Sequence, residues 1–172
     1  VVARAMAVAQ EQYIGLFCKM LLRYRRQYAT RGFVFCIEGD GLTRRRKIFA
    51  GYKADRIPTE EFNEARRNVK RLLQWCRCQI VQAPEGEADD AIASFITQKC
   101  AGTDVVIISA DRDLWQLISR SVKVVVDLHH DDVPVDRFAC LRRIGVDPVG
   151  IPLYKAVFGD KSDEIPPGVP RQ

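Results

Sequence analysis

Short apolar runs alternate with longer amphipathic segments along almost the whole sequence. Four of the apolar runs are typical of buried strands, at residues 33–37, 79–81, 105–109 and 122–126. Strands that alternate with helices favour an α/β domain, with a mostly parallel central sheet flanked by helices. In such sheets, ligands bind outside the carboxyl ends of the strands.

The segments between these runs have helical spacing. Ile14, Phe17 and Leu21 share one face of a helix predicted within residues 1–29. Thr59 has the residue type of an N-cap, and acidic residues follow it at the positive end of the helix dipole. Further helices are predicted over residues 42–52, 59–76, 87–99, 113–118, 135–143 and 149–158, with a loop-like tail from residue 164.

Length and composition predict one domain with a sizeable core. The chain has 172 residues, of which 47% are hydrophobic, a composition that argues against global disorder. No apolar run reaches the roughly 18–20 residues of a membrane span. Residues 1–80 hold 17 Lys and Arg against 7 Asp and Glu, whereas residues 81–172 hold 10 against 15. A basic half beside an acidic half indicates a polyanion-binding surface next to a cation-binding pocket, or an ordinary polar surface.

Carboxylates gather in four places along the chain. Three of the four groups lie just beyond the carboxyl end of a predicted strand, where the crevice of the sheet would be. The groups are Glu38; Glu87, Asp89 and Asp90; Asp111 and Asp113; and Asp160 and Asp163.

Such a cluster needs positive charge. Two like charges about 4 Å apart repel by roughly 4 kcal/mol at an effective dielectric of about 20. Oxygen ligands without nearby His or Cys suit Mg²⁺ or Mn²⁺, and two such ions can activate water and stabilise the leaving oxygen of a phosphodiester. Each carboxylate taken singly is better explained as a helix cap or a surface residue, and only the joint placement of the four groups favours a metal site.

Three motifs carry a resemblance to a known family. EADD at residues 87–90, SADRD at 109–113 and GDKSDEIP at 159–166 occur in the order and spacing of the 5′-3′ exonuclease and flap endonuclease family. That family includes the 5′ nuclease domain of bacterial DNA polymerase I and the phage 5′ nucleases. The resemblance covers nearly the whole chain and implies a PIN-like fold with a basic helical arch.

The resemblance also implies a two-metal site. Its first-metal positions match Glu87, Asp89 and Asp111, with Asp90 acting through water. Its second-metal positions match Asp113, Asp160 and Asp163. Glu38 stands where the family usually has Asp.

The basic half resembles the arch of this family. YKADR at residues 52–56 is similar to its Tyr-Lys-x-x-Arg stretch. By that likeness, Lys53 would stabilise charge on the scissile phosphate, Arg56 would hold a phosphate and Tyr52 would stack on a base. Arg4 matches a phosphate-binding arginine, and four basic residues would line the arch or form a solvated helix face: Arg44, Arg45, Arg46 and Lys47.

Residues 1–172 are therefore expected to form the catalytic domain of this family, without its first strand and its C-terminal helix-hairpin-helix region. The expected function is a structure-specific 5′ nuclease that uses two Mg²⁺ or Mn²⁺ ions and acts on DNA with 5′ ends, flaps or branches. A DNA polymerase or replisome is a possible partner, no membrane is involved, and the expected location is the cytoplasm. The alternatives are a non-catalytic module that binds branched DNA, a phosphatase for small phosphate esters, and an RNase on the same fold.

Other conspicuous residues have ordinary explanations. The six cysteines show no disulfide framework, and Cys76 and Cys78 form a lone C-x-C, so we expect reduced thiols in the interior. Trp75 and Trp115 lie on apolar faces and are expected in the core. His129 and His130 are expected at the surface.

Overall fold

The computed structural model describes residues 10–30, 32–39, 44–53, 58–126, 133–163 and 165–169. Its helices and strands follow one another in this order: α1 (Gln10–Gln27), β1 (Val34–Ile37), α2 (Arg44–Ile48), α3 (Glu60–Trp75), β2 (Gln79–Gln82), α4 (Ala88–Lys99), β3 (Val105–Ile108), β4 (Val122–Val125), α5 (Arg137–Ile144) and α6 (Ile151–Phe158). Three 3₁₀ turns lie at η1 (Arg112–Leu117), η2 (Pro148–Gly150) and η3 (Lys161–Asp163).

The strands confirm the predicted parallel α/β arrangement. In the described part of the chain they form two parallel pairs, β1 with β2 and β3 with β4. Val34 pairs with Gln79 in the first, and Val105 with Val122 in the second. Each pair joins strands separated by helical segments, which is the connection that parallel strands require.

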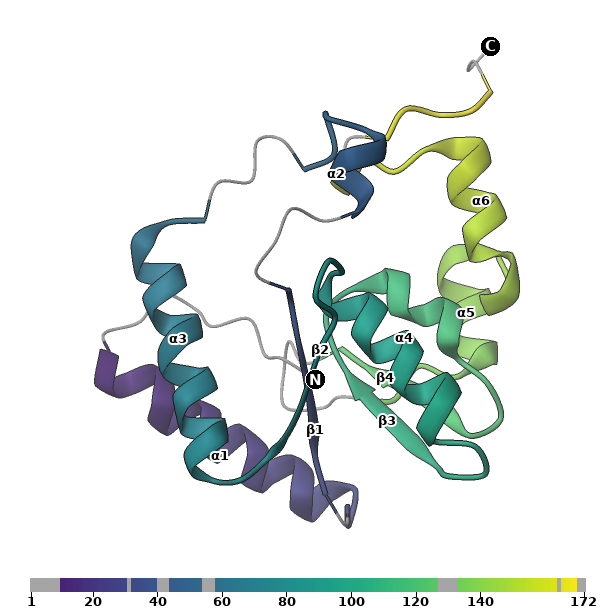
Figure 1. The fold of residues 1–172 in the computed structure, drawn as a ribbon. Coiled ribbons are helices and arrows are strands. Elements are labelled where there is room, and N and C mark those ends of the chain that lie inside the picture. The colour runs from purple at the N-terminus through teal and green to yellow at the C-terminus, as the bar shows by residue number, and fades with distance from the viewer. Residues whose placement is uncertain are drawn as a thin grey trace.

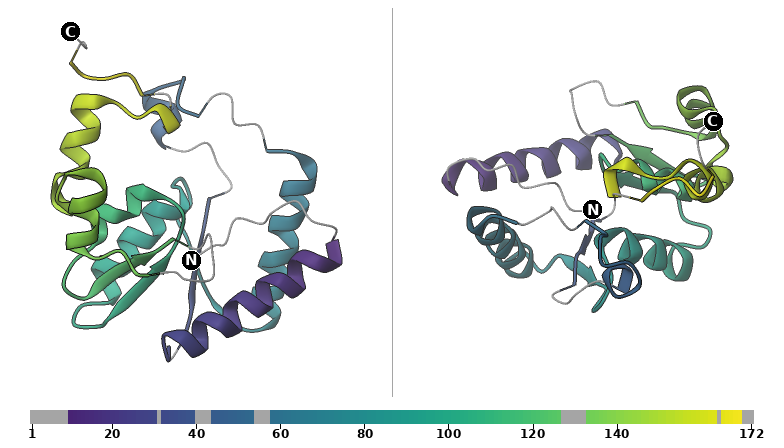
Figure 2. Two further views of the ribbon diagram at one scale, coloured as in Figure 1. Left: turned by 180° about the vertical axis from the view of Figure 1, so that it is seen from behind. Right: turned by 90° about the horizontal axis from the view of Figure 1, so that it is seen from above.

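Strand β1 divides the core into two clusters. Successive side chains of a strand point to opposite faces, so Phe35 and Cys36 enter different clusters. Phe35 packs with Phe17 of α1 and Leu73 of α3. Cys36 belongs to the larger cluster, which α4, β3, β4, η1, α5 and α6 complete. Figure 1 and Figure 2 show α1 and α3 at one end of the molecule and α5 and α6 at the other.

The helix boundaries follow from local chemistry. Thr59 caps α3 as predicted, and its side chain accepts a hydrogen bond from the Phe62 backbone N–H. The predicted basic helix over residues 42–52 is shorter than expected, since α2 ends at Ile48 and a turn follows. Gly51 lies in that turn, and glycine is a poor helix former because it loses much backbone freedom there.

Several expectations about single residues have definite outcomes. Trp115 is buried as predicted, but the prediction for Trp75 is wrong, because its side chain is 88% exposed. Two residues along a helix turn a side chain by about 200°, so the buried Leu73 leaves Trp75 facing solvent.

The cysteines also divide. Cys36 and Cys140 are buried free thiols, whereas Cys18 and Cys76 are exposed, contrary to expectation. His129 and His130 lie outside the described residues. Every helix within the described ranges is too short or too polar to cross a membrane.

Candidate metal centre and its basic surroundings

The first turn of α4 presents three carboxylates beyond the end of β2. Glu87 is the N-cap residue, and its side chain is buried with an overall exposure of 6%. Its backbone N–H donates to Asp90 Oδ2 at 3.0 Å, which stabilises the helix start. These acidic residues lie at the beginning of the helix, where the helix dipole favours negative charge.

Arginine and lysine side chains neutralise this acidic turn. Arg45 donates two hydrogen bonds to Asp90, at 2.7 and 2.9 Å, and lies 3.6 Å from Asp89 and 3.3 Å from Glu87. Burial would lower the pKa of the Arg45 guanidinium, but Asp89 and Asp90 outweigh burial and raise it. Burial raises the pKa of Asp89, and the positive charge of Arg45 offsets only part of that rise.

Lys53 lies in the same acidic site. Its ammonium donates to Glu87 Oε2 at 2.7 Å and lies 3.7 Å from Asp163 Oδ1. The backbone of Lys53 has a positive φ of 50°, which is uncommon for a residue with a Cβ. Arg46 stabilises this turn by donating to the carbonyls of Tyr52 at 3.1 Å and Lys53 at 2.7 Å. Arg46 thus fixes the backbone that directs Lys53 towards the carboxylates.

Tyr52 connects the two acidic groups. Its side chain is buried, and its hydroxyl lies 3.0 Å from Glu87 Oε2 and 3.3 Å from Asp163 Oδ2. The hydroxyl has one hydrogen and therefore donates to one of these oxygens at a time. Burial raises the pKa of Tyr52, and the negative charge of Glu87 raises it further. Stacking on a base would require the ring to leave this position.

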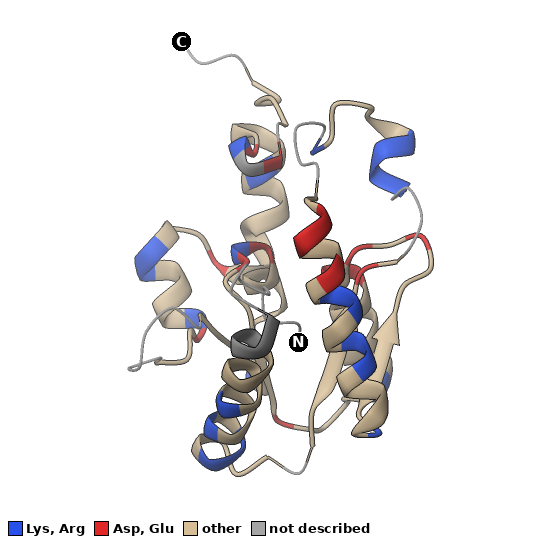
Figure 3. Cartoon of the chain, turned by 90° about the vertical axis from the view of Figure 1, so that its left-hand side faces the viewer, with Lys and Arg blue, Asp and Glu red and all other residues tan. Residues whose placement is uncertain are grey.

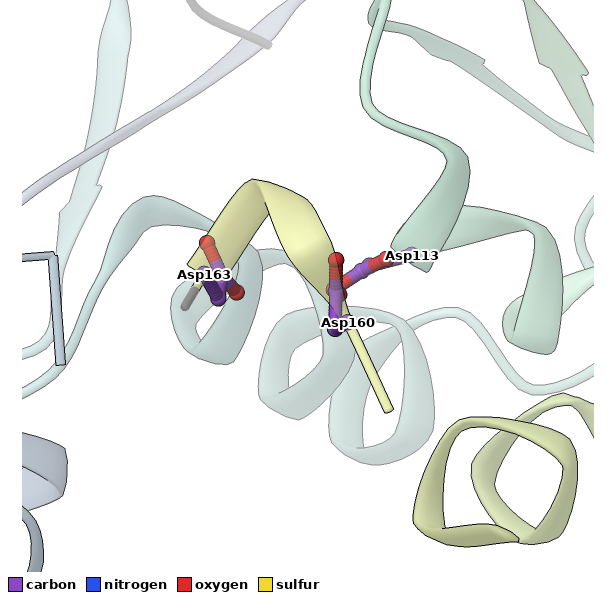
Figure 4. A group of neighbouring side chains, drawn as sticks. All are labelled: Asp113, Asp160 and Asp163. Atoms are coloured by element: carbon purple, nitrogen blue, oxygen red, sulfur yellow. The ribbon is translucent and has the colours of Figure 1, made fainter. Parts of the chain in front are cut away.

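Asp113, Asp160 and Asp163 form a close group of three carboxylates, which we call the acidic trio. Each offers a ligand oxygen, and these oxygens lie within 4.8 Å of one another. Asp113 comes from η1 after β3, and the other two follow α6, as Figure 4 shows. An antiparallel bridge between Asp160 and Ile165 closes the short loop that carries them.

Lys155 binds the acidic trio and was not identified from the sequence. Its ammonium donates to Asp160 Oδ2 at 2.5 Å and also to Asp113 Oδ1. Burial would lower the pKa of Lys155, but these two hydrogen bonds raise it, so the side chain is a cation at neutral pH. The available signal was a single lysine in the apolar helix α6, five positions before Asp160.

The trio suits a hard divalent cation. Its donors are carboxylate oxygens at close range, the set that Mg²⁺ and Mn²⁺ prefer. The ammonium of Lys155 already lies between two of them as a cation of another kind. Within the described residues, Glu87, Asp89, Asp90 and Asp111 form no second group of this closeness.

The other predicted site residues that the structure describes have contacts outside the trio or lie next to it in sequence. Asp111 is exposed and caps η1 by accepting from the Asp113 N–H at 2.9 Å. Glu38 is exposed and lies 3.5 Å from Arg66, a partner that the sequence analysis did not anticipate. Arg44 and Lys47 are exposed on α2, where Lys47 pairs with Glu85 at 3.1 Å. Arg4 and Arg56 lie outside the described residues.

Comparison with known proteins identifies the family. Residues 6–145 match the family described as "5′-3′ exonuclease, N-terminal resolvase-like domain". The 5′-3′ exonuclease of Aquifex aeolicus is 31% identical over 153 residues, 87% of this chain and 52% of that protein. DNA polymerase I of Caldicellulosiruptor bescii is 31% identical over 156 residues, 87% of this chain and 18% of that protein. The chain thus spans about half of the first relative and under a fifth of the second.

Solved structures agree on the fold. The flap endonuclease of bacteriophage T5, in a pseudo-enzyme–product complex with DNA and metal ions, has a TM-score of 0.76 at 18% identity and covers 96% of this chain and 66% of its own. The T5 5′-exonuclease with bound zinc has a TM-score of 0.76 at 18% identity, over 92% of this chain and 63% of its own. These likenesses confirm the predicted PIN-like α/β fold. By the match over residues 6–145, the chain belongs to the family of the 5′-3′ exonuclease N-terminal resolvase-like domain.

Proposed function

We propose that this chain is the catalytic domain of a metal-dependent 5′ nuclease that hydrolyses DNA phosphodiesters near 5′ ends or flap junctions. The observation that carries the proposal is the acidic trio beside the basic turn at Lys53, whose ammonium lies 3.7 Å from Asp163. Acidic oxygens that bind cations, next to side chains that bind phosphate, are the two parts that phosphodiester hydrolysis requires.

The carboxylates would divide between two ions. Asp113, Asp160 and Asp163 would hold one Mg²⁺ or Mn²⁺ ion. Glu87, Asp89 and Asp111 would hold the other, with Asp90 acting through water. Such ions supply an activated water and stabilise the leaving oxygen. For the second group to form, Arg45 would have to leave Asp89 and Asp90, and Glu38 would join only after leaving Arg66.

The basic side chains of the chain would then act on DNA. Lys53 would turn from Glu87 to the scissile phosphate and stabilise its developing charge, while Arg56 would hold a neighbouring phosphate. Arg45, freed from the carboxylates, would join Arg4, Arg44 and Lys47 on the phosphate backbone. The oxygen of a water molecule joins phosphorus and the 3′ oxygen leaves with a proton, so the products end in a 5′-phosphate and a 3′-hydroxyl.

The partners follow from this chemistry. The substrate would be DNA with a free 5′ end, a flap or a branch, in the cytoplasm. A DNA polymerase is the protein partner we propose, because DNA polymerase I of Caldicellulosiruptor bescii is among the relatives.

Cleavage of a 5′-labelled flap DNA in Mg²⁺ or Mn²⁺ tests the proposal. We expect cleavage near the junction that a chelator abolishes and that the double variant Asp113→Asn, Asp160→Asn lacks. Asp104→Asn is the matched control, because this exposed carboxylate lies in the turn before β3, outside the site. Unchanged cleavage in the double variant would refute the assignment of the trio.

A second candidate is a module that binds branched DNA without cutting it. It is favoured by the contacts of Arg45 and Lys53, which engage the carboxylates of the other proposed ion. Binding of the flap without metal-dependent cleavage would support it. An RNA flap of the same sequence, tested in parallel, separates the DNA nuclease from an RNase.

A further inference from the structure

Lys155 binds two of the three carboxylates that make up the acidic trio. It projects from the last turn of α6, with a side chain that is 30% exposed, onto Asp160, which is 10% exposed, and Asp113, which is 25% exposed. The ammonium contacts Asp113 Oδ1 and Asp160 Oδ2 together. The carboxylates of η1 and of the loop after α6 therefore converge on the ammonium that α6 provides.

The ammonium and a metal ion exclude one another at this position. Mg²⁺ binds carboxylate oxygens at about 2.0–2.1 Å and demands near-octahedral geometry. An ammonium on the same two oxygens would block that approach, and the two cations would also repel each other. Lys53 offers no comparable obstacle to the trio, because it reaches only Asp163, at 3.7 Å, and hydrogen-bonds to Glu87 instead.

We propose that Lys155 is an internal counter-ion that a divalent cation displaces from Asp113 and Asp160 when it binds. The inference rests on the proposed metal site, and it adds the Lys155 ammonium as a competitor of the metal ion for these two carboxylates. In the metal-free protein, Lys155 keeps the close carboxylates from repelling one another and holds them together. The same contact weakens metal binding, because the ion must first break two charge-assisted hydrogen bonds.

Replacing the ammonium by a neutral side chain of similar length separates these effects. In Lys155→Met, we expect the affinity for Mn²⁺, measured by calorimetry, to rise roughly tenfold, a change that corresponds to about 1.4 kcal/mol. The metal-free variant should melt at a lower temperature than the unaltered protein, and Mn²⁺ should raise its melting temperature by more. Lys155→Arg keeps the charge and should restore most of the original affinity.

The control for lost charge alone is Lys123→Met. Lys123 is exposed on β4, away from the trio, so its loss should leave the Mn²⁺ affinity unchanged. Equal affinities in Lys155→Met and the unaltered protein would overturn the inference and leave the metal site intact. Absence of Mn²⁺ binding in both proteins would instead remove the metal site itself, and the proposed function with it.

A second measurement needs no variant. Acetylation of lysines, read by mass spectrometry, reports how accessible each ammonium is. Saturation of the unaltered protein with Mn²⁺ should increase the reactivity of Lys155 several-fold and leave that of Lys123 unchanged. Reactivity of Lys155 that stays the same or falls as metal binds would overturn the displacement, even if Lys155→Met failed to fold.

Discussion

Glu87 is the most heavily engaged carboxylate of the site. Its Oε2 lies within 3.3 Å of donors from three side chains, Arg45, Tyr52 and Lys53, while the residue is 6% exposed. A buried charge is tolerated when it is paired and hydrogen-bonded in this way. Truncating it would leave Lys53 without its close partner and α4 without the Glu87 side chain of its capping box.

We therefore predict that Glu87→Ala lowers the free energy of unfolding by about 2 kcal/mol, less than for a fully buried pair because Arg45 and Lys53 reach solvent. Denaturation by urea measures this. Glu85→Ala is the control, since Glu85 is exposed and pairs only at the surface with Lys47. Equal losses in the two variants would contradict the special role of Glu87.

The pH dependence of metal binding follows from Asp113. Burial raises the pKa of Asp113 above its ordinary value of 3.8, and the nearby carboxylates add to this although Lys155 opposes it. The folded protein therefore keeps a proton on Asp113 at pH values where the unfolded chain has lost it. That contribution to stability is present below 3.8 and disappears as the pH rises through the folded pKa.

A metal ion needs the ionised carboxylate of Asp113. Protons therefore compete with the metal over the pH range in which the folded protein titrates this group. We predict that the rise in melting temperature caused by Mn²⁺ declines with falling pH while the pH is still above 3.8. Melting curves with and without Mn²⁺ from pH 8 to pH 4 check this. If the Mn²⁺-induced rise in melting temperature stayed constant until the pH approached the ordinary carboxyl pKa of 3.8, Asp113 would not be a ligand.

At the scale of elements, the close approach of the β1 end to the loop before α4 positions the site. The Gly39 N–H donates to the Gly86 carbonyl at 3.1 Å. A Cβ on Gly39 would lie 2.3 Å from the Ala83 carbonyl oxygen and 2.5 Å from that of Pro84. Backbone atoms, not flexible side chains, would have to move.

Gly39→Ala should accordingly destabilise the protein by about 1–3 kcal/mol, the usual cost of overpacking. Gly32→Ala is its control, because a Cβ there meets nothing within 4 Å. Thermal unfolding of both variants distinguishes them. A Gly39→Ala protein as stable as Gly32→Ala would mean that the two loops do not touch in solution.

The elements themselves were largely predictable because their signals are local. The N-cap at Thr59 and the apolar strand runs depend on near neighbours, and both are found where expected. The exposure of Trp75 was not predictable, because it depends on which side of α3 finds a packing partner.

At the scale of the whole molecule, basic side chains gather on α1 and α2, whereas α3 carries acidic side chains at its start and basic ones after them. Figure 3 shows lysine and arginine along α1 and α2, and on α3 acidic residues at the start followed by lysine and arginine. Three of the four carboxylate groups were predictable from their positions after strands, whereas Asp160 and Asp163 follow α6 and were indicated by the resemblance of their motif. The cations that pair with the carboxylates were not predictable, because Arg45 meets Asp90 across 45 residues and Lys155 meets Asp113 across 42, contacts that exist only once the chain has folded.

The charge on α2 predicts how DNA binding depends on salt. Arg44 and Lys47 are exposed there, and each phosphate contact contributes roughly 0.9 to the slope of log affinity against log salt. Replacing both by Ala should therefore weaken flap binding and reduce that slope by about 2. Fluorescence anisotropy at several KCl concentrations measures it. The pair Lys99→Ala, Lys123→Ala, exposed on other elements, should change neither quantity, and an equal effect there would point to bulk charge alone.

The most direct test of the account is to locate a bound ion. Anomalous scattering from crystals grown with Mn²⁺ shows where the metal lies and where the Lys155 side chain goes. We predict a peak in contact with Asp113, Asp160 and Asp163, with the Lys155 ammonium withdrawn from the first two. A well-occupied Mn²⁺ peak elsewhere, with Lys155 still bound to both carboxylates, would contradict the assignment of the trio as the metal centre.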